Sequence, residues 1–168
     1  FDHVDHLHPD SIIALATSKD GQKLTQECFG DEILWVNWRR PGFQLGLDMA
    51  KIAKENPKAK GCVLGGHGLT TWGVSSKECE ERSIWAITKA EEFIKVKGKA
   101  DPFGKKEAKY APLAPAARKE RAAALAPYLR GIASKDMRML GSFTDNDVVL
   151  DFLQGSKLMQ LAALGTSC

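Results

Sequence analysis

The sequence lacks several features that are typical of large protein classes, such as membrane, dinucleotide-binding and repeat proteins. No apolar run approaches the roughly 20 residues needed to span a bilayer, so we expect no membrane association. The sequence has no Gly-x-Gly-x-x-Gly motif, which excludes the glycine-rich phosphate turn of a dinucleotide-binding domain from these residues. It also shows no internal repeat.

An excess of one charge and closely paired cysteines are missing as well. The 24 basic and 21 acidic residues are mixed along the chain and give a net charge of +3, without the basic patch that nucleic acid binding needs. The four cysteines form neither a CxxC pair nor a small disulfide scaffold: Cys28, Cys62, Cys79 and Cys168. We therefore expect reduced thiols in a cytoplasmic protein that binds no nucleic acid.

The chain of 168 residues, with 43% hydrophobic and 27% charged residues, suits one globular domain with an appendage. Strand signals alternate with helical patterns along its first part. We expect strands at residues 1–8, 33–36, 62–64 and 69–74, and helices at residues 11–16, 22–29 and 42–56. This alternation predicts an α/β layered domain.

A capping box, Ser75 followed by Glu78, predicts the start of a long helix. Its predicted inner face consists of four apolar residues: Ile84, Ile87, Ala90 and Ile94. Residues 97–115 read as an irregular, exposed connection, and residues 116–133 as an alanine-rich helix with a kink at Pro127. We expect a strand at 137–143 and a short strand or helix within 145–164.

Histidine is rare, and three of the four histidines lie in the first eight residues. In a strand, His6 and His8 point to the same face, roughly 6.5 to 7 Å apart, so both imidazoles could bind one ion. His67 follows an apolar run in a glycine-flanked loop, where the backbone can approach a site closely. A catalytic zinc commonly has three protein ligands. The pattern alone leaves a metal site and three unrelated histidines both open.

Other residues have a possible role beside such a site and a more ordinary alternative. His3 lies at an odd spacing from His6, so we expect it to face away. Carboxylates that could orient the ligands, but could equally be loop or cap residues, are Asp2, Asp5 and Asp10. Tryptophans that could line a pocket, although core or interface packing is favoured, are Trp35, Trp38, Trp72 and Trp85. Arg39 and Arg40 could bind a phosphate, but a solvated turn is favoured.

The chain contains the motif His6-Leu7-His8-Pro9 and, further downstream, Gly65-Gly66-His67-Gly68-Leu69. The two motifs and the spacing between them resemble the zinc site of the class II aldolase/adducin family. The resemblance covers residues 1–97. Residues 27–32, 40–46 and 161–168 resemble one branch more closely, in which an aldolase region precedes a short-chain dehydrogenase region.

The resemblance implies a three-layer α/β/α sandwich, incomplete at the N-terminus, in a homotetramer with sites near subunit boundaries. It implies that His6, His8 and His67 hold Zn²⁺. It further implies reversible cleavage of L-rhamnulose 1-phosphate to dihydroxyacetone phosphate and L-lactaldehyde, in which the metal stabilises the negative charge left when the carbon–carbon bond breaks.

The same resemblance divides the chain into a metal-binding part, residues 1–97, and an extension toward a dehydrogenase region, residues 98–168. The family's catalytic glutamate and phosphate-binding loops are expected upstream of Phe1, so the chain alone should bind zinc but have little activity. Alternative functions are a sugar-phosphate 4-epimerase and a non-catalytic, adducin-like interaction module. Retention of all three histidines argues against the module.

Overall fold

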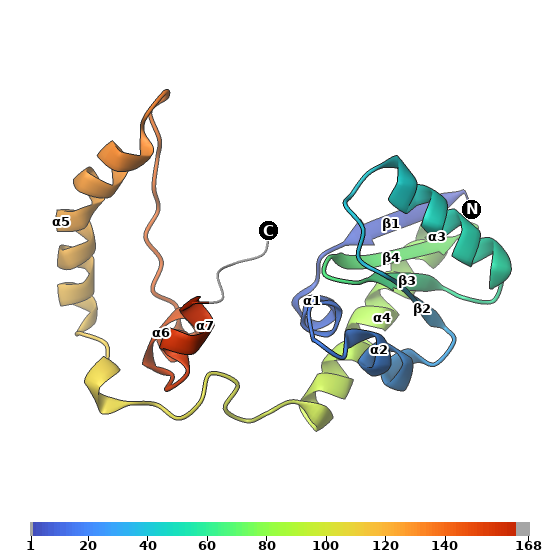
Figure 1. Ribbon diagram of the computed structural model, residues 1–168, viewed down its shortest axis with the longest axis horizontal. Coiled ribbons are helices and arrows are strands. Elements are labelled where there is room, and N and C mark those ends of the chain that lie inside the picture. The colour runs from blue at the N-terminus through green and yellow to red at the C-terminus, as the bar shows by residue number, and fades with distance from the viewer. Residues whose placement is uncertain (1, 164–168) are drawn as a thin grey trace. The chain divides into compact units, whose positions relative to one another are not determined.

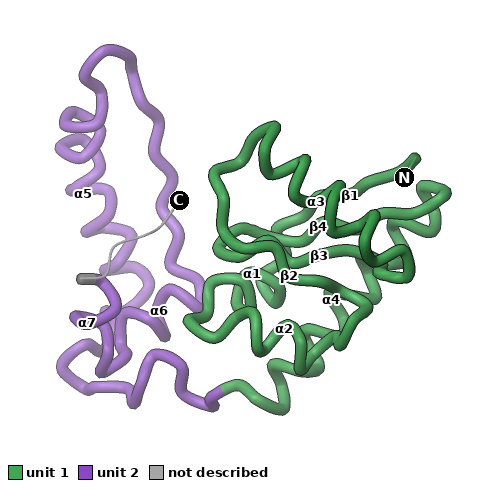
Figure 2. Tube along the Cα trace, turned by 45° about the vertical axis from the view of Figure 1, so that its right-hand side comes forward, with its two compact units in different colours: residues 1–98 green, residues 99–168 purple. Residues whose placement is uncertain are grey.

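The computed structural model describes residues 2–163, which belong to two compact units, residues 1–98 and residues 99–168 (Figure 2). Cys168 and Leu164, which take part in the thiol and 145–164 predictions, lie outside the described residues. None of the helices within residues 2–163 combines the length and apolar character needed to cross a membrane.

The first unit contains a four-stranded mixed sheet (Figure 1). The strands are β1 (His3–Leu7), β2 (Ile33–Val36), β3 (Gly61–Leu64) and β4 (Gly68–Gly73). They lie in the order β1-β4-β3-β2. β4 pairs antiparallel with both β1 and β3, whereas β2 pairs parallel with β3. The strand predictions for this unit are confirmed.

Helices cover both faces of this sheet. Helices α1 (Asp10–Ala16), α2 (Gly21–Phe29) and α4 (Ser76–Lys97) pack on the face that carries Val63 and Leu69. Helix α3 (Phe43–Glu55) packs on the opposite face, against Cys62 and Trp72. Alternate residues of β3 and β4 thus belong to two separate cores. The three-layer α/β/α prediction is confirmed.

The predicted inner face of α4 is wrong in part. Ile84 is 57% exposed, whereas the buried residues of α4 are small: Cys79, Ser83, Ala86 and Ala90. Close packing on β4 explains this choice, because the Ser83 hydroxyl lies 2.6 Å from the Thr71 hydroxyl and leaves no room for a longer side chain. The predicted cap is present, since the Glu78 amide donates to the Ser75 hydroxyl at 3.2 Å.

The second unit is helical in its described residues. It contains the 3₁₀ turn η1 (Ala108–Tyr110) and the helices α5 (Pro115–Ala133), α6 (Asp147–Gln154) and α7 (Leu158–Ala163). The alanine-rich helix is confirmed, with Pro127 inside α5. Residues 145–164 adopt the helical alternative as far as they are described.

The strand predicted at residues 137–143 is wrong. This segment is in no helix or strand, and no other described strand of its unit lies beside it to pair with its backbone. Its hydrogen bonds go to side chains instead: the Met139 amide donates to the Ser134 hydroxyl at 3.0 Å, and the Met139 carbonyl accepts from Arg130 Nε at 3.0 Å. An apolar, extended sequence becomes a strand only when it finds a partner.

Candidate metal centre

Strand β1 and the residue after it carry two of the three clustered histidines. β1 lies at the edge of the sheet, with His6 opposite Thr70 of β4. His8 follows the end of the strand and precedes Pro9, the N-cap of α1. Both side chains are exposed. The strand alternation therefore points both rings to the face of the sheet on which α3 packs, as their spacing predicts.

The third histidine, His67, lies in the tight turn between β3 and β4. Its amide donates to the Leu64 carbonyl at 2.9 Å, which closes the turn. Gly66 has a φ of +68°, a left-handed conformation that a side chain would strain. A Cβ at Gly68 would lie 2.5 Å from His8 Cδ2. Glycines on both sides of His67 thus let the turn and the first histidine segment approach each other.

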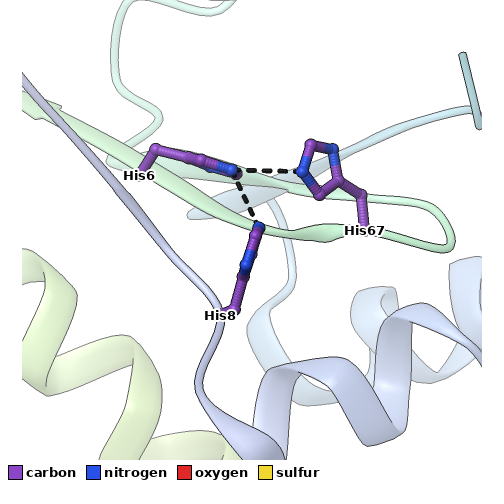
Figure 3. Close-up of side chains that lie close together, drawn as sticks. All are labelled: His6, His8 and His67. Carbon is purple, nitrogen blue, oxygen red and sulfur yellow. Dashed lines mark hydrogen bonds between the residues drawn. The ribbon is translucent and has the colours of Figure 1, made fainter. Parts of the chain in front are cut away.

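The three imidazoles converge through their Nε2 atoms (Figure 3). His6 Nε2 lies 3.0 Å from His8 Nε2 and 3.2 Å from His67 Nε2, and one nitrogen from each ring falls within 4.8 Å of the others. Zinc–nitrogen bonds of about 2.0–2.1 Å in a tetrahedral site place ligand nitrogens roughly 3.3 Å apart. The spacing around His6 is close to that value.

The tautomer of His6 is set by the neighbouring strand. Its Nδ1 lies 2.9 Å from the Leu69 carbonyl oxygen, which can only accept, so Nδ1 is the donor. The Thr70 hydroxyl lies 3.1 Å from the same nitrogen. In the neutral ring the lone pair is therefore on Nε2, at the centre of the cluster. The lone pair of His6 Nε2 can accept well from only one of the two neighbouring ring nitrogens, those of His8 and His67. A divalent cation bound by all three nitrogens suits the arrangement better.

His67 is also held in a form that can bind a metal. Burial, and then repulsion from His6 and His8, lowers the pKa of its imidazole, so it stays neutral at pH 7. Its Nδ1 atom is buried without a hydrogen-bond partner among the described residues. Ligand histidines usually donate through this second nitrogen. His67 thus lacks a second hydrogen bond of the kind that orients His6.

The groups that orient His6 were not found by sequence reasoning. Among the described residues, the hydrogen bonds of the three rings involve no carboxylate. Asp5 interacts instead with the Cys79 thiol of α4, on the opposite face of the sheet. His3 is exposed and lies outside the cluster. The orienting atoms come from Leu69 and Thr70, and only the pairing register of β1 with β4 reveals them.

The structure favours the ordinary alternative for most of the tryptophans and arginines. Trp72 is 2% exposed, and its indole N–H donates to the Ala59 carbonyl at 2.8 Å. Trp35 and Trp85 pack against the core of the first unit. Arg39 forms an ion pair with Asp48 at 2.5 Å, which favours a structural role. Trp38 differs: it is 69% exposed and packs beside Gly66, next to His67.

The described cysteines are not additional ligands of the cluster. Cys28, Cys62 and Cys79 are free and buried. Burial raises the pKa of Cys28 to about 11 and that of Cys62 to about 12, and it also raises the pKa of Cys79. These thiols are therefore neutral at physiological pH, whereas a metal ligand must be a thiolate.

The chain belongs to the class II aldolase and adducin family. Residues 1–94 match the class II aldolase and adducin N-terminal domain, and residues 120–168 match the second domain of class II aldolases. The first match contains all three clustered histidines. The second begins within α5.

Individual proteins show the same similarity. Over 169 aligned residues the chain is 34% identical to the uncharacterized oxidoreductase YuxG of Bacillus subtilis, covering all of this chain and 24% of that protein. The chain thus spans about a quarter of the length of this relative.

Two solved structures are also similar. One is the N-terminal class II aldolase domain of a conserved Thermoplasma acidophilum protein, with 28% identity, a TM-score of 0.47, and coverage of 54% of this chain and 41% of the other. The second is YgbL of Klebsiella pneumoniae, described as a candidate aldolase, epimerase or decarboxylase. It has 18% identity, a TM-score of 0.45, and coverage of 57% and 49%.

Proposed function

We propose that His6, His8 and His67 bind Zn²⁺ and form the metal centre of an enzyme that cleaves L-rhamnulose 1-phosphate to dihydroxyacetone phosphate and L-lactaldehyde. The observation that carries the metal part is the convergence of three Nε2 atoms, with the lone pair of His6 turned inward. The substrate rests on the resemblance of residues 27–32 and 40–46 to one branch of the family. The name oxidoreductase given to the relative YuxG supports that branch, because a dehydrogenase region is the feature by which the resemblance distinguishes the branch.

The donor set suits the metal and leaves a role for it in catalysis. Three neutral imidazoles are ordinary zinc ligands, and a catalytic zinc keeps a fourth position open. When bound, Zn²⁺ would supply a Lewis acid that stabilises negative charge on the substrate oxygens as the carbon–carbon bond breaks.

The residues of the chain position the donors and leave them accessible. Leu69 and Thr70 fix the His6 ring, and the lowered pKa of His67 keeps its imidazole neutral. His6 and His8 are exposed, so a sugar phosphate can reach the cluster from solvent. The resemblance assigns proton transfer to a glutamate that precedes Phe1, so activity should be assayed in the whole protein.

Metal analysis of the purified chain tests the proposal. We expect about one zinc per chain at neutral pH, lost in His6→Ala and in His67→Ala and retained in the control His3→Ala. Absence of bound metal in the unmodified chain would favour the adducin-like module.

Product analysis then identifies the reaction. The whole protein should release dihydroxyacetone phosphate from L-rhamnulose 1-phosphate, and His6→Ala should abolish this release. Inversion of a pentulose phosphate at C4 without release of a triose phosphate would identify an epimerase instead. Both reactions depend on stabilising the same kind of charge, so metal content alone does not separate them.

A further inference from the structure

His67 depends on its backbone for its position in the cluster. Its Nδ1 is buried without a hydrogen-bond partner among the described residues, whereas His6 Nδ1 donates to the Leu69 carbonyl. A metal ligand must be held close to its productive geometry by packing or by hydrogen bonds from the residues around it. For His67 this support has to come through the turn that carries it, residues 65–67, which we call the His67 turn.

Two consecutive amides tie the His67 turn to other elements. The Gly65 amide donates to the Val36 carbonyl at the end of β2, at 2.8 Å, and the Gly66 amide donates to the Ala16 carbonyl at the end of α1, at 2.7 Å. Glycine loses more conformational freedom on folding than any other residue. These two hydrogen bonds therefore restrain a part of the chain that is intrinsically flexible, and packing from outside is needed to keep it in place.

Two indole rings supply that packing. A Cβ added to Gly65 would lie 2.6 Å from Trp35 Cζ2, and one added to Gly66 would lie 2.9 Å from Trp38 Cδ1. Both distances are too short for real side chains, so each ring fills the space that a side chain on the glycine would take. The ring atoms are then within van der Waals contact of the glycine backbone. The two residues directly before His67 are thus each covered by a tryptophan.

The ring of Trp35 is fixed at both ends. Its indole N–H donates to Asn37 Oδ1 at 2.9 Å. The opposite edge of the ring reaches Gly21 at the start of α2, where an added Cβ would lie 3.0 Å from Trp35 Cη2. Trp35 also packs against the core of the first unit. It therefore connects the His67 turn to α2 and to the core.

Trp38 is held in a different way, because its side chain is 69% exposed. The residues on either side of it are anchored: Asn37 accepts from the indole of Trp35, and Arg39 pairs with Asp48 of α3 at 2.5 Å. An indole that is mostly in solvent adds little to the folding free energy through burial. Its place on Gly66 therefore indicates an effect on the His67 turn more than on the stability of the core.

We propose that Trp35 and Trp38 are positioning residues for His67. The two indoles hold the His67 turn, so that the imidazole stays at the centre of the cluster, where its nitrogen can bind the metal ion. This inference rests on the metal centre proposed above. Because Trp38 is exposed and Trp35 is part of the core, Trp38 should affect metal affinity almost alone, whereas Trp35 should affect both affinity and stability.

Zinc affinity of the whole chain, measured by competition with a chromophoric chelator, tests the proposal. Trp38→Ala should weaken zinc binding about 10- to 100-fold, the usual effect of the residues that support a metal ligand. Trp38→Phe should restore most of the affinity, because a flat ring still covers Gly66. Trp35→Phe, which loses the hydrogen bond to Asn37 and part of the ring, should weaken zinc binding about 10-fold.

Trp85→Ala is the matched control. Trp85 is a half-buried tryptophan that packs against the core of the first unit from α4 and has Lys60 over its ring. Its removal should lower the free energy of unfolding and leave the zinc affinity unchanged. Trp38→Ala should show the reverse, with a nearly unchanged free energy of unfolding in the absence of metal.

The absorption spectrum of bound Co²⁺ reports whether His67 remains a ligand. In Trp38→Ala the spectrum should approach that of His67→Ala, and in Trp38→Phe it should stay close to that of the wild type. A loss of stability alone would lower the amount of folded protein without changing the ligands of the ion.

Amide hydrogen exchange of the metal-free chain tests the two indoles without the metal. The amides of Gly65 and Gly66 should exchange at least about 10-fold faster in Trp38→Ala than in the wild type, while that of Val63 in β3 should not change. A wild-type chain that binds no zinc would reject the metal centre, and this exchange would still decide whether the indoles hold the turn.

Three results would each overturn the proposal. They are an unchanged zinc affinity in Trp38→Ala, an equal loss of affinity in Trp85→Ala, and unchanged exchange of the Gly66 amide in Trp38→Ala. If the whole protein with Trp38→Ala kept its zinc affinity but showed a higher KM for the sugar phosphate, Trp38 would contact the substrate and would not position His67.

Discussion

The Nδ1 atom of His6 donates a hydrogen bond to the carbonyl oxygen of Leu69, 2.9 Å away on the neighbouring strand. A backbone acceptor, which cannot be mutated or protonated, thereby fixes the tautomer of a proposed ligand. The same register places the Thr70 hydroxyl 3.1 Å from this nitrogen. The side chain of Thr70 is therefore the one part of this arrangement that a substitution can remove.

Thr70→Val should weaken zinc binding without removing it. The variant loses the hydroxyl beside His6 Nδ1 but keeps the Leu69 carbonyl, so we expect the affinity to fall about 10-fold, the lower end of the effect of outer hydrogen bonds on metal sites. Competition with a chromophoric chelator measures the change. Thr71→Val, which alters the adjacent residue on the other face of β4, is the control; an equal loss there would show that the effect is only structural.

The glycine at position 68 should be required for the approach of His8. A Cβ there would lie 2.5 Å from His8 Cδ2 and 2.7 Å from the Leu7 carbonyl, so Gly68→Ala should lower the free energy of unfolding by about 1–3 kcal/mol and reduce zinc content. Gly46→Ala is the opposite case, because Gly46 lies inside α3 with no atom within 4 Å of its added Cβ. Urea denaturation should show that this second variant is about 0.5–1 kcal/mol more stable than the wild type.

Removing the hydroxyl of Thr25 should stabilise the folded protein. It is 1% exposed, and its Oγ1 has no hydrogen-bond partner among the described residues. Burying an unpaired polar group costs free energy, so Thr25→Val should raise the free energy of unfolding by about 1 kcal/mol. A loss of stability in thermal or urea denaturation would mean that the hydroxyl has a partner in solution.

Glu32 should make the stability of the first unit depend on pH. Hydrogen bonds from Lys60, and then from Lys89, lower the pKa of this carboxyl below 4.5, outweighing the smaller opposing effect of burial. A pKa that is lower in the folded state stabilises the protein above the unfolded-state pKa, and the contribution is lost as the pH falls through the folded-state pKa. Wild type should therefore exceed Glu32→Gln in urea midpoint at pH 7, and the difference should shrink below about pH 5.

Glu80→Gln is the control for this comparison. Glu80 is an exposed residue of α4 outside the ion pairs of Glu32. Its difference from wild type at pH 7 should be small, because Glu80 takes part in none of the ion pairs among the described residues. A pH-independent difference for Glu32→Gln would contradict the assignment of the two lysines as its stabilising partners.

Local pattern was sufficient to predict elements whose boundaries depend on nearby residues. The strand at residues 33–36 and the start of α4 at Ser75 follow from side-chain chemistry within a few positions. The face of α4 could not be predicted in this way, because Ile84 is apolar yet exposed while Ser83 is polar yet buried. The close approach of α4 to β4 selects small side chains. The periodicity of apolar residues along a helix does not reveal how closely that helix packs on a strand.

In the candidate metal centre, too, local sequence predicts some features and only the packing of distant segments reveals the others. The spacing of His6 and His8 predicts their shared face, and the structure brings His67 to them. The orienting role of Leu69 and Thr70 follows from strand register, which no single segment specifies. The prediction of a strand at residues 137–143 was wrong for a related reason: the composition suits a strand, but pairing requires a second strand.

The histidine cluster combines two segments that lie far apart in the sequence: β1 with the residue after it, and the turn between β3 and β4. His67 is brought near its neighbours by a local hairpin, whereas His6 and His8 are some sixty residues away along the chain, and closing so long a loop is slow compared with forming a hairpin. Capture of a metal ion by all three rings therefore reports the arrival of β1 at the edge of the sheet. In a refolding experiment, a spectroscopically visible ion such as Co²⁺ would time the docking of β1 on β4.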